Sequence, residues 1–312
     1  MISSSENPKV SILIPTYNRE NYIGPCIESA QNQIYDNIEI IIVDNKSSDK
    51  TKEICTKYAA ADPRILFFQN SENIGPVRNW KKCAENASGV YCKILFSDDL
   101  LMPDCISTMV SAFNSAEISL VYSSVECGLE ESKTTKIYDL GEDIKLSPKD
   151  FTKKIIEGSA PVSPGAILLR TTDLRKNLHL DFPTYCAQKY TQNGAGPDVM
   201  VSLLTAIEYP FVQHISKSLT FFRIHNQSFT VENKNDTVTS GYQSAISYFL
   251  YQKMHSLWIT YITKKYAEIL IRDRKLHPIR SHIKKFNGKG DFFEHASFSV
   301  CFLKKLTKRI FK

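Results

Sequence analysis

The chain has 312 residues, of which 42% are hydrophobic, 11% aromatic and 23% charged. These proportions are those of an ordinary globular protein, and they exclude a disordered chain, a collagen-like chain and a small disulfide scaffold. The length fits one large domain with an appendage, or two modest domains.

The formal net charge of +6 is concentrated towards the C-terminus. Residues 264–312 hold 14 Lys and Arg against 4 Asp and Glu, whereas residues 1–263 are net negative. A general nucleic-acid binder would carry its positive charge on a folded patch with interleaved aromatic residues, and the sequence has no signature of such a module. We therefore expect no nucleic-acid partner, and the basic tail needs its own explanation.

The eight cysteines are scattered, with no Cys-x-x-Cys pair, which is typical of reduced thiols in a cytoplasmic protein. Residues 1–9 are polar and Ser-rich, unlike a secretory signal. The longest apolar stretch, residues 244–262, is interrupted by Gln252, Lys253 and His255, so we expect no membrane-spanning helix.

Residues 1–125 alternate β-branched runs with amphipathic segments, which predicts strand–helix–strand units on a mostly parallel sheet. One expected helix follows a cap signal at Ser47 and Ser48, and another begins with Pro76. The expected strands are 10–14, 38–43, 65–68, 91–96 and 118–123, and the expected helices are 21–33, 49–61 and 76–87.

The second half has a less regular pattern. Residues 126–150 are polar and of mixed charge, which indicates a loop with a short hairpin. From about residue 240 the chain is expected to be helical and increasingly basic. Between these stretches we expect a helix at 148–157, a strand at 166–170, a Gly/Pro loop at 193–197, a helix at 198–207 and a strand at 218–225.

Polar residues follow the first four predicted strands, at the edge where an open parallel sheet binds ligands. No Gly-x-Gly-x-x-Gly follows any of these strands, which argues against a dinucleotide fold of the dehydrogenase type. The absence of a Gly-rich loop after the first strand also argues against an unrelated nucleotidyltransferase. The polar stretches are 15–19 (PTYNR), 44–48 (DNKSS), 73–75 (NIG) and 97–99 (SDD).

Each of these polar positions has a functional and a structural interpretation. Asp98 and Asp99 would repel each other unless a cation lies beside them, and a hard divalent cation that holds a diphosphate suits such a pair. Alternatively, Asp99 or Asp104 caps the next helix. Asp44 either accepts hydrogen bonds from a base or ribose or caps a helix, and Tyr17 either stacks on a ligand or packs in the protein.

The order of these segments (VSILIPTYNR, EIIIVDN with SSDKT, NIG, RN and LFSDD) closely resembles the inverting, nucleotide-sugar-dependent glycosyltransferases of family 2. The resemblance implies their GT-A fold, an α/β domain with a mostly parallel sheet flanked by helices, here with a helical basic C-terminal extension. It implies a nucleotide-sugar-binding half (1–125), an acceptor-binding and catalytic-base half (126–235) and a helical basic region (236–312).

Position by position, the resemblance implies a donor site at the edge of the sheet. Pro15, Thr16 and Tyr17 would form the pocket around the nucleotide base, and Asp44 would bind the base or the ribose. Arg78 occupies a position where many members of the family carry an arginine and would face the nucleotide.

The resemblance also implies a metal-bound diphosphate. Asp98 would contact the ribose and the metal, and Asp99 would ligate Mn2+ or Mg2+. Many members have Asp-x-Asp-Asp where this chain has Ser-Asp-Asp, so the first carboxylate is absent here. Arg223 and His225 match an Arg-x-His element, in which the arginine approaches the diphosphate and the histidine reaches the metal. A lone histidine near apolar residues is usually structural, and within this element the structural role of His225 and a metal or diphosphate contact stay equal alternatives.

An inverting displacement needs a base for the attacking hydroxyl on the face of the sugar opposite the leaving diphosphate. Asp198 opens an amphipathic helix after a Gly/Pro loop, at the place of the family's base, although Pro197 replaces the acidic residue that often precedes it. The helix dipole would help to keep Asp198 ionised. The alternative is an ordinary first-turn aspartate.

The resemblance thus implies a transferase that moves a sugar from a nucleotide sugar to a hydroxyl of a growing glycan or lipid-linked saccharide. A UDP-sugar is the expected donor, with GDP- and dTDP-sugars as variants. Residues 126–150 and 161–194 are expected to recognise the acceptor. The basic stretch 292–312 either makes a peripheral contact with an anionic membrane or forms a solvated face. A competing hypothesis is an inactive GT-A scaffold at the membrane.

Overall fold

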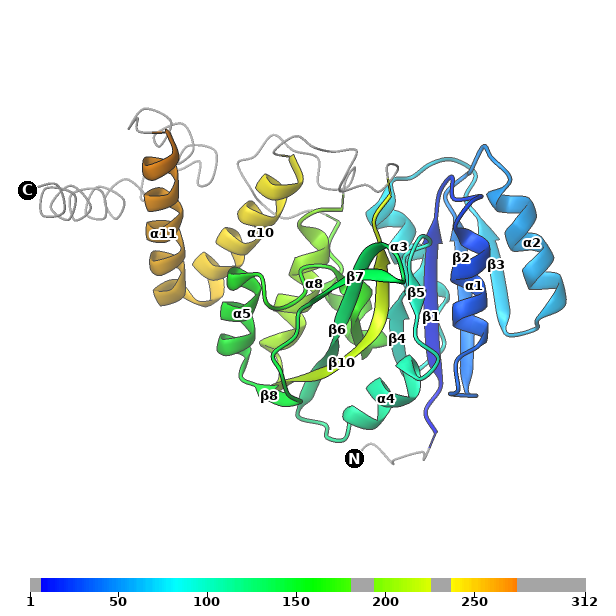
Figure 1. Ribbon diagram of the computed structural model, residues 1–312, viewed down its shortest axis with the longest axis horizontal. Coiled ribbons are helices and arrows are strands. Elements are labelled where there is room, and N and C mark those ends of the chain that lie inside the picture. The colour runs from blue at the N-terminus through cyan, green and yellow to red at the C-terminus, as the bar shows by residue number, and fades with distance from the viewer. Residues whose placement is uncertain (1–6, 181–193, 226–236, 274–312) are drawn as a thin grey trace, which may run out of the picture.

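The computed structural model describes residues 7–180, 194–225 and 237–273. Within these residues, one ten-stranded sheet runs through the molecule, with helices on both faces (Figure 1). Its strand order is β3-β2-β1-β4-β9-β6-β10-β5, with β7 beside β6 and β8 beside β10. Strands β3, β2, β1 and β4 are parallel to their neighbours in this group, and β6 is parallel to β10, whereas β9 is antiparallel to both of its neighbours.

The strands and helices predicted for the first half are present, with small shifts at their ends. The predicted strand at 91–96 ends two residues early, just before the turn at residues 97–98 that carries the first residue of the carboxylate pair. The strands are β1 (Val10–Thr16), β2 (Ile38–Asp44), β3 (Ile65–Gln69) and β4 (Tyr91–Ile94), and the helices are α1 (Ile23–Gln31), α2 (Thr51–Ala61) and α3 (Pro76–Asn86).

Alternation along β1 explains why helices cover both faces of the sheet. Ile12 and Ile14 are buried with the residues of α1 and of α4 (Cys105–Ala112), whereas Leu13 is buried with those of α3 and of α8 (Pro197–Ala206). A strand that helices cover on both faces has no solvent-exposed face, which accounts for the almost continuous apolar runs of β1 and β2.

The prediction that Ser47 and Ser48 cap the second helix is wrong. Helix α2 begins at Thr51, and no side chain caps it from the N-cap residue, Lys50. The Ser47 hydroxyl donates instead to the carboxylate of Asp44 at the end of β2. Ser47 therefore hydrogen-bonds to the buried Asp44 carboxylate and not to the N-terminus of helix α2.

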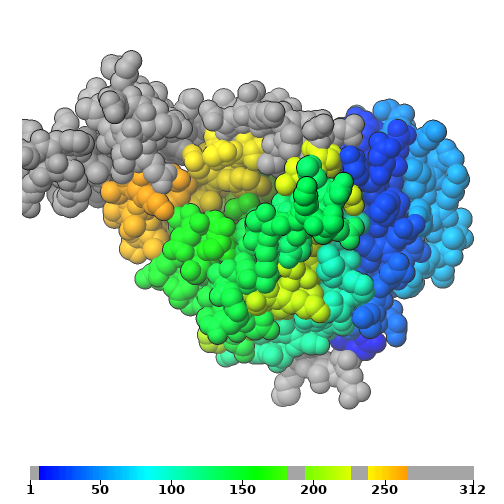
Figure 2. All heavy atoms as spheres, in the orientation of Figure 1, coloured from blue at the N-terminus to red at the C-terminus, as the bar shows by residue number. Residues whose placement is uncertain are grey.

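The polar segment 126–150 contains the expected hairpin. Strand β6 (Ile118–Glu130) runs across residue 125 and pairs antiparallel with β7 (Lys133–Ile137), and β8 (Ile144–Leu146) pairs with β10. Both halves of the expected GT-A domain thus contribute strands to one sheet. In Figure 2 the first-half elements, blue to cyan, lie directly against the green and yellow second half.

The helices expected at 148–157 and 198–207 and the strand expected at 166–170 are present, whereas β10 (Phe211–Arg223) begins seven residues before the expected strand at 218–225 and ends two residues before its end. Three register shifts against β6 interrupt its alternation and hide the early part of the strand. The short elements at 100–101, 164–166 and 171–177 were not predicted. The other elements are β5 (Leu100–Leu101), α5 (Pro148–Glu157), the 3-10 turn η1 (Pro164–Ala166), β9 (Ile167–Arg170) and α6 (Thr171–Asn177).

Two helices, α10 (Thr237–Lys253) and α11 (His255–Asp273), follow, with α11 at the opposite end of the molecule from α2 (Figure 1). Phe249 of α10 and Trp258 of α11 are buried in the same apolar cluster as Leu203 of α8. The first part of the expected C-terminal region is therefore packed on the catalytic-base half. The expected basic helix at 292–312 lies outside the described residues, and none of the helices within them has the length and apolar character to cross a bilayer.

At the opposite edge of the sheet from the polar loops, one buried carboxylate ties three chain segments together. Glu39 of β2 accepts hydrogen bonds from the Ser11 hydroxyl of β1 at 2.5 Å and from the backbone N–H of Ser88 at 2.6 Å, and Lys9 pairs with it at 2.7 Å. Burial alone would raise the pKa of Glu39, but the hydrogen bonds from Lys9, Ser11 and Ser88 outweigh it and lower the pKa to about 2.

We predict that Glu39→Gln lowers the free energy of unfolding by about 1 to 3 kcal/mol at pH 7. Because the folded-state pKa lies below the unfolded value, this contribution is complete above about pH 4.5 and is lost as the pH falls towards 2. Urea unfolding at pH 7 and pH 3 measures it, with the exposed Glu53→Gln as control. A deficit that is the same at both pH values would contradict the prediction.

Candidate functional site

The carboxyl ends of β1 and β2 lie side by side, because Thr16 is in register with Asp44. The two loops that follow are tied to each other. The backbone N–H of Asn18 donates to the Ser47 hydroxyl at 2.8 Å, and the N–H of Ser48 donates to the Asn18 side chain at 2.9 Å. Asn18 has a φ of 50°, a left-handed conformation that asparagine tolerates. These loops therefore form one polar rim at the edge of the sheet.

Asp44 lies under this rim and is fully buried. Its carboxylate accepts hydrogen bonds from the Ser47 backbone and hydroxyl, and from the Gln69 amide at 2.7 Å. Gln69 ends β3 in register with Asp44. It was not predicted as a site residue, because the polar segment expected after the third strand was 73–75. A ligand that binds Asp44 directly has to take the place of Ser47 or Gln69.

The other residues of the expected base pocket differ in exposure. Pro15 is buried, and Tyr17 is 42% exposed at the surface of the rim. The Thr16 hydroxyl is buried and has no hydrogen-bond partner among the described residues. Arg78 is exposed on α3, and no hydrogen bond or ion pair joins it to the rim within the described chain. The structure therefore brings Thr16, Tyr17 and Asp44 together but does not connect Arg78 to them.

A network of asparagine side chains explains the polar NIG segment. The Asn45 amide donates to Asn73 at 2.8 Å and accepts from the N–H of Ile74 at 2.9 Å. Asn79 on α3 donates to the carbonyl of Val43 at 2.9 Å. These contacts hold the third loop against the end of β2, so NIG and RN serve to shape the rim.

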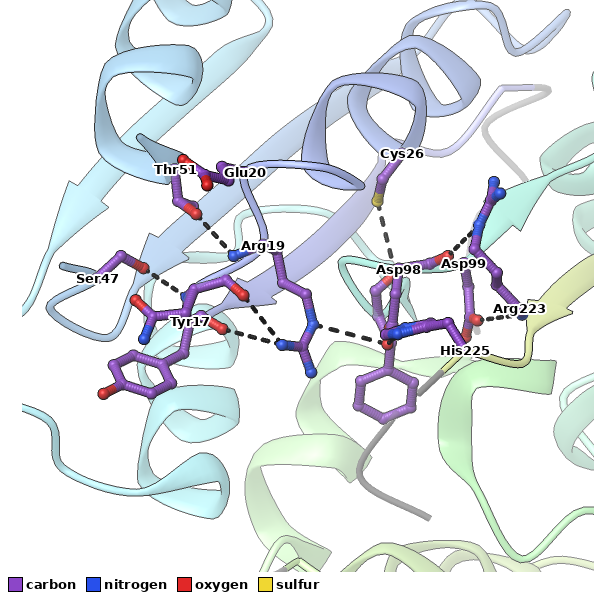
Figure 3. Close-up of polar contacts among 12 residues, drawn as sticks. Tyr17, Arg19, Glu20, Cys26, Ser47, Thr51, Asp98, Asp99, Arg223 and His225 are labelled. Carbon is purple, nitrogen blue, oxygen red and sulfur yellow. Dashed lines mark hydrogen bonds and ion pairs between the residues drawn. The ribbon is translucent and has the colours of Figure 1, made fainter. Parts of the chain in front are cut away.

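The second group of site residues surrounds the carboxylate pair (Figure 3). His225 Nε2 lies 3.0 Å from Asp98 Oδ2, and the Arg223 side chain donates to the Asp98 carbonyl at 3.1 Å. The backbone N–H of Arg223 donates to Asp99 Oδ1 at 3.0 Å. The expected metal and diphosphate residues therefore meet where β10 ends beside the loop after β4. Asp99 does not begin a helix, since α4 starts at Cys105.

Two residues without a predicted role complete this group. Arg19 Nε lies 3.7 Å from Asp98 Oδ2, on the opposite side from His225 in Figure 3. Tyr22 stacks on the His225 ring with centroids 4.2 Å apart. Arg19 lies inside the quoted PTYNR segment, so its position was visible in the sequence, but its partner 79 residues later was not.

Asp99 is the more deeply buried of the two carboxylates, with 7% exposure. Burial and then the charge of Asp98 raise the pKa of Asp99 well above its usual value. Lys93 of β4 is fully buried nearby and donates to the Gly165 carbonyl, and its burial lowers the pKa of the ammonium. A positive charge bound at Asp99 would offset the unfavourable ionisation of this carboxylate.

This electrostatic imbalance is what a divalent cation would correct, but the side chains do not form a complete cage. Within the described residues no three His, Cys, Asp or Glu side chains converge on one point. Mg2+ in phosphate-transferring sites is held by one or two carboxylates together with substrate phosphates and water. Asp98 and Asp99 fit that arrangement, with His225 beside them.

Asp198 occupies the first turn of α8, next to the end of the Gly/Pro loop, and is 5% exposed. Oδ1 accepts from the N–H groups of Gly196 at 2.8 Å and Val199 at 2.7 Å, and Oδ2 accepts from the Tyr242 hydroxyl at 2.6 Å. Burial raises the pKa of Asp198 to about 7, although these hydrogen bonds oppose the rise. Burial is therefore the larger effect, and the hydrogen bonds that favour the ionised carboxylate offset it only in part.

Fold and site together define a GT-A glycosyltransferase. Glycosyl transferase family 2 matches residues 11–175, and the chain belongs to this family. EpsH of Bacillus subtilis, described by its name as a glycosyltransferase, is 30% identical over 76% of this chain and 67% of its own length. A GalNAc(5)-diNAcBac-PP-undecaprenol beta-1,3-glucosyltransferase of Campylobacter jejuni is 34% identical over 46% of this chain, which spans only about half of that protein (47%).

Solved structures of TarS from S. aureus share the fold. The complex of TarS 1–349 with UDP-GlcNAc superimposes with a TM-score of 0.58 at 16% identity, over 82% of this chain and 80% of TarS 1–349. The complex with UDP has the same TM-score at 19% identity, over 78% of this chain and 70% of that one. The expected family, fold class and enzyme class are thus confirmed.

We predict that Asp99→Asn raises the melting temperature at pH 8 by roughly 2 to 4 °C in the presence of a chelator. The raised pKa means that the folded state binds the Asp99 proton more tightly, so ionisation lowers stability as the pH rises above the usual aspartate range. The gain should shrink towards pH 4. A variant that is less stable than the wild type at pH 8 would show that the buried charge is already compensated.

Proposed function

We propose that this glycosyltransferase moves a sugar from a UDP-sugar to a hydroxyl of a growing glycan or lipid-linked saccharide, with inversion at the anomeric carbon. The observation that carries the proposal is the meeting of Asp98, Asp99, Arg223 and His225 at the sheet edge that also bears Asp44. The similarity to TarS, solved with UDP and UDP-GlcNAc, supports the choice of nucleotide.

The rim after β1 and β2 would bind the nucleoside. Tyr17 has an exposed ring on which a base can stack, and the buried Thr16 hydroxyl offers a polar atom without a partner in the described chain. Asp44 would accept a hydrogen bond from the base or ribose once Ser47 or Gln69 yields its place. Arg78, exposed on α3, would reach the nucleotide only by changing its side-chain conformation.

Asp99 and His225 would serve as ligands of Mn2+ or Mg2+, and Asp98 would contact the metal and the ribose. Such an ion, when bound, stabilises the charge that develops on the departing diphosphate. Arg223 would lie against the same phosphate oxygens, and Arg19 would keep Asp98 oriented by pairing with it. The leaving diphosphate would therefore lie beside the positive charge of Arg223 and the metal-binding carboxylates.

Asp198 would be the base that accepts the proton of the attacking hydroxyl. A pKa of about 7 suits this task, because the carboxylate is largely ionised at slightly alkaline pH and still basic enough to accept a proton. Its place on α8, a different element from the carboxylate pair, is consistent with attack from the face opposite the leaving group. The Campylobacter relative, named for a lipid-linked acceptor, supports a similar acceptor class here.

We predict that calorimetric titration with UDP, GDP and dTDP, each with and without Mn2+, detects binding that depends on the metal and is strongest for UDP. Asp99→Ala should weaken the metal-dependent binding about tenfold or more, equivalent to about 1.4 kcal/mol. The control is Asp104→Ala, which changes the N-cap residue of α4 and should leave this binding unchanged. Binding of none of the nucleotides in either condition would favour the inactive scaffold instead.

We predict that Asp198→Asn lowers kcat by about 10²- to 10⁴-fold while nucleotide binding is unchanged. Release of the nucleoside diphosphate, measured with a panel of sugar donors of the nucleotide identified by calorimetry and a panel of lipid-linked saccharides, reports the rate. Asp173→Asn is the matched control, because Asp173 is also a buried first-turn aspartate that accepts a tyrosine hydroxyl. Equal activity of both variants would remove Asp198 from the mechanism.

A further inference from the structure

The proposed base is held by a side chain from outside the expected GT-A domain. Tyr242 lies in the second turn of α10, beyond residue 235, and is partly buried against the apolar cluster that contains α8. Its hydroxyl donates to Asp198 Oδ2 at 2.6 Å. Asp198 therefore depends on helix α10 for one of its three side-chain hydrogen bonds within the described chain.

Donors among the described residues account for three of the four lone-pair sites of the Asp198 carboxylate. Each carboxylate oxygen has two lone-pair sites. Oδ1 uses both, on the N–H groups of Gly196 and Val199, and Oδ2 uses one on the Tyr242 hydroxyl. If Asp198 is the base, the remaining site on Oδ2 would accept the substrate hydroxyl, and the Tyr242 hydrogen bond would fix the orientation of that site.

The backbone is shaped to bring Tyr242 to this place. Gly241 packs so closely on the loop before α8 that an added Cβ would lie 2.5 Å from the Ala195 carbonyl oxygen. Gly196, the residue that follows Ala195, has a φ of 127°, a backbone conformation that residues with a side chain rarely adopt. The two glycines therefore allow helix α10 to contact the loop before α8, next to the hydrogen bond between Tyr242 and Asp198.

We propose that Tyr242 is a positioning residue for the transfer reaction, which holds Asp198 as an oriented carboxylate and makes helix α10 part of the active site. This inference rests on the proposed role of Asp198 as the base. A positioning residue acts through another group, so its loss should alter the ionisation and alignment of Asp198 more than the binding of the donor.

The direction of the effect on ionisation follows from the contacts of Asp198. Among the residues that the structure describes, the titratable groups that interact with Asp198 are Tyr242 on α10 and Tyr138 in the segment between β7 and β8. Burial, and then Asp198, raise the pKa of Tyr242 well above its usual value, so the phenol stays protonated and remains the donor. Its hydrogen bond favours the ionised carboxylate, and removing it raises the pKa of Asp198 above about 7.

The test is an NMR pH titration of aspartate carboxyl carbons in the full chain, with the Asp198 signal assigned by its loss in Asp198→Asn. We expect a midpoint near 7 in the wild type and a rise of about one unit or more in Tyr242→Phe. Tyr209→Phe is the matched control, because it removes the equivalent hydrogen bond to Asp173 and should leave the Asp198 midpoint unchanged.

The same variants are compared in the transfer assay. Tyr242→Phe should move the acidic limb of the kcat profile to higher pH and lower kcat, with little change in nucleotide affinity, whereas Tyr209→Phe should not. An unchanged midpoint and pH profile in a folded Tyr242→Phe, while Asp198→Asn is inactive, would overturn the role of Tyr242 alone. Full activity of Asp198→Asn would overturn the proposed base itself.

A further substitution covers the case in which Tyr242→Phe does not fold. Site-specific replacement of Tyr242 by 3-fluorotyrosine keeps the ring and makes the hydroxyl a stronger donor. It should therefore lower the Asp198 midpoint, opposite to the effect of phenylalanine. No change of the midpoint on fluorination would also overturn the proposal.

Discussion

The cost of burying carboxylates governs the arrangement of this site. Asp44, Asp99 and Asp198 are all less than a tenth exposed, and each is compensated in a different way. Asp44 receives hydrogen bonds from two neighbouring side chains and a loop backbone. Asp198 receives two backbone N–H groups and a phenol, yet burial still raises its pKa to about 7. Asp99, beside a second carboxylate, receives only partial compensation from the chain and so favours a bound cation.

The difference in compensation between Asp99 and Asp198 suits them to different steps of the proposed reaction. A carboxylate that is poorly compensated by the protein gains most from a metal-bound diphosphate, which suits the leaving-group side. A carboxylate with a pKa near neutrality can take up a proton and release it, which suits the attacking side. The same buried environment therefore supports two kinds of chemistry, because the groups around each carboxylate differ.

The proposed role of Tyr242 would extend the active site beyond the expected boundary at residue 235, onto helix α10. Phe249 and Trp258 bury this helix and α11 in the core of the second half, so Tyr242 is held on a rigid support. A catalytic base that must point in one direction benefits from such a support. On the proposed mechanism, the helices after the GT-A sheet would serve the chemistry as well as the packing.

Much of this was accessible from the sequence. The alternation of β-branched runs with amphipathic segments predicted a mostly parallel sheet, and the polar segments after the strands predicted the edge where Asp44, Asp98 and Asp99 lie. The pairing of Arg223 and His225 with the carboxylate pair agrees with the Arg-x-His element. Strand β10 was predicted too short, because its bulges against β6 remove the alternation on which a strand prediction relies.

The sequence by itself determined the family, the α/β order of the first half and the residues at the carboxyl edge, since these follow from local periodicity and from motifs within short segments. Only the tertiary structure decided which partners each carboxylate has. Gln69 reaches Asp44, Arg19 reaches Asp98 and Tyr242 reaches Asp198 across 25 to 79 residues of chain. Such contacts depend on how strands and helices pack, and a hydrogen bond between distant segments leaves no pattern in either one alone.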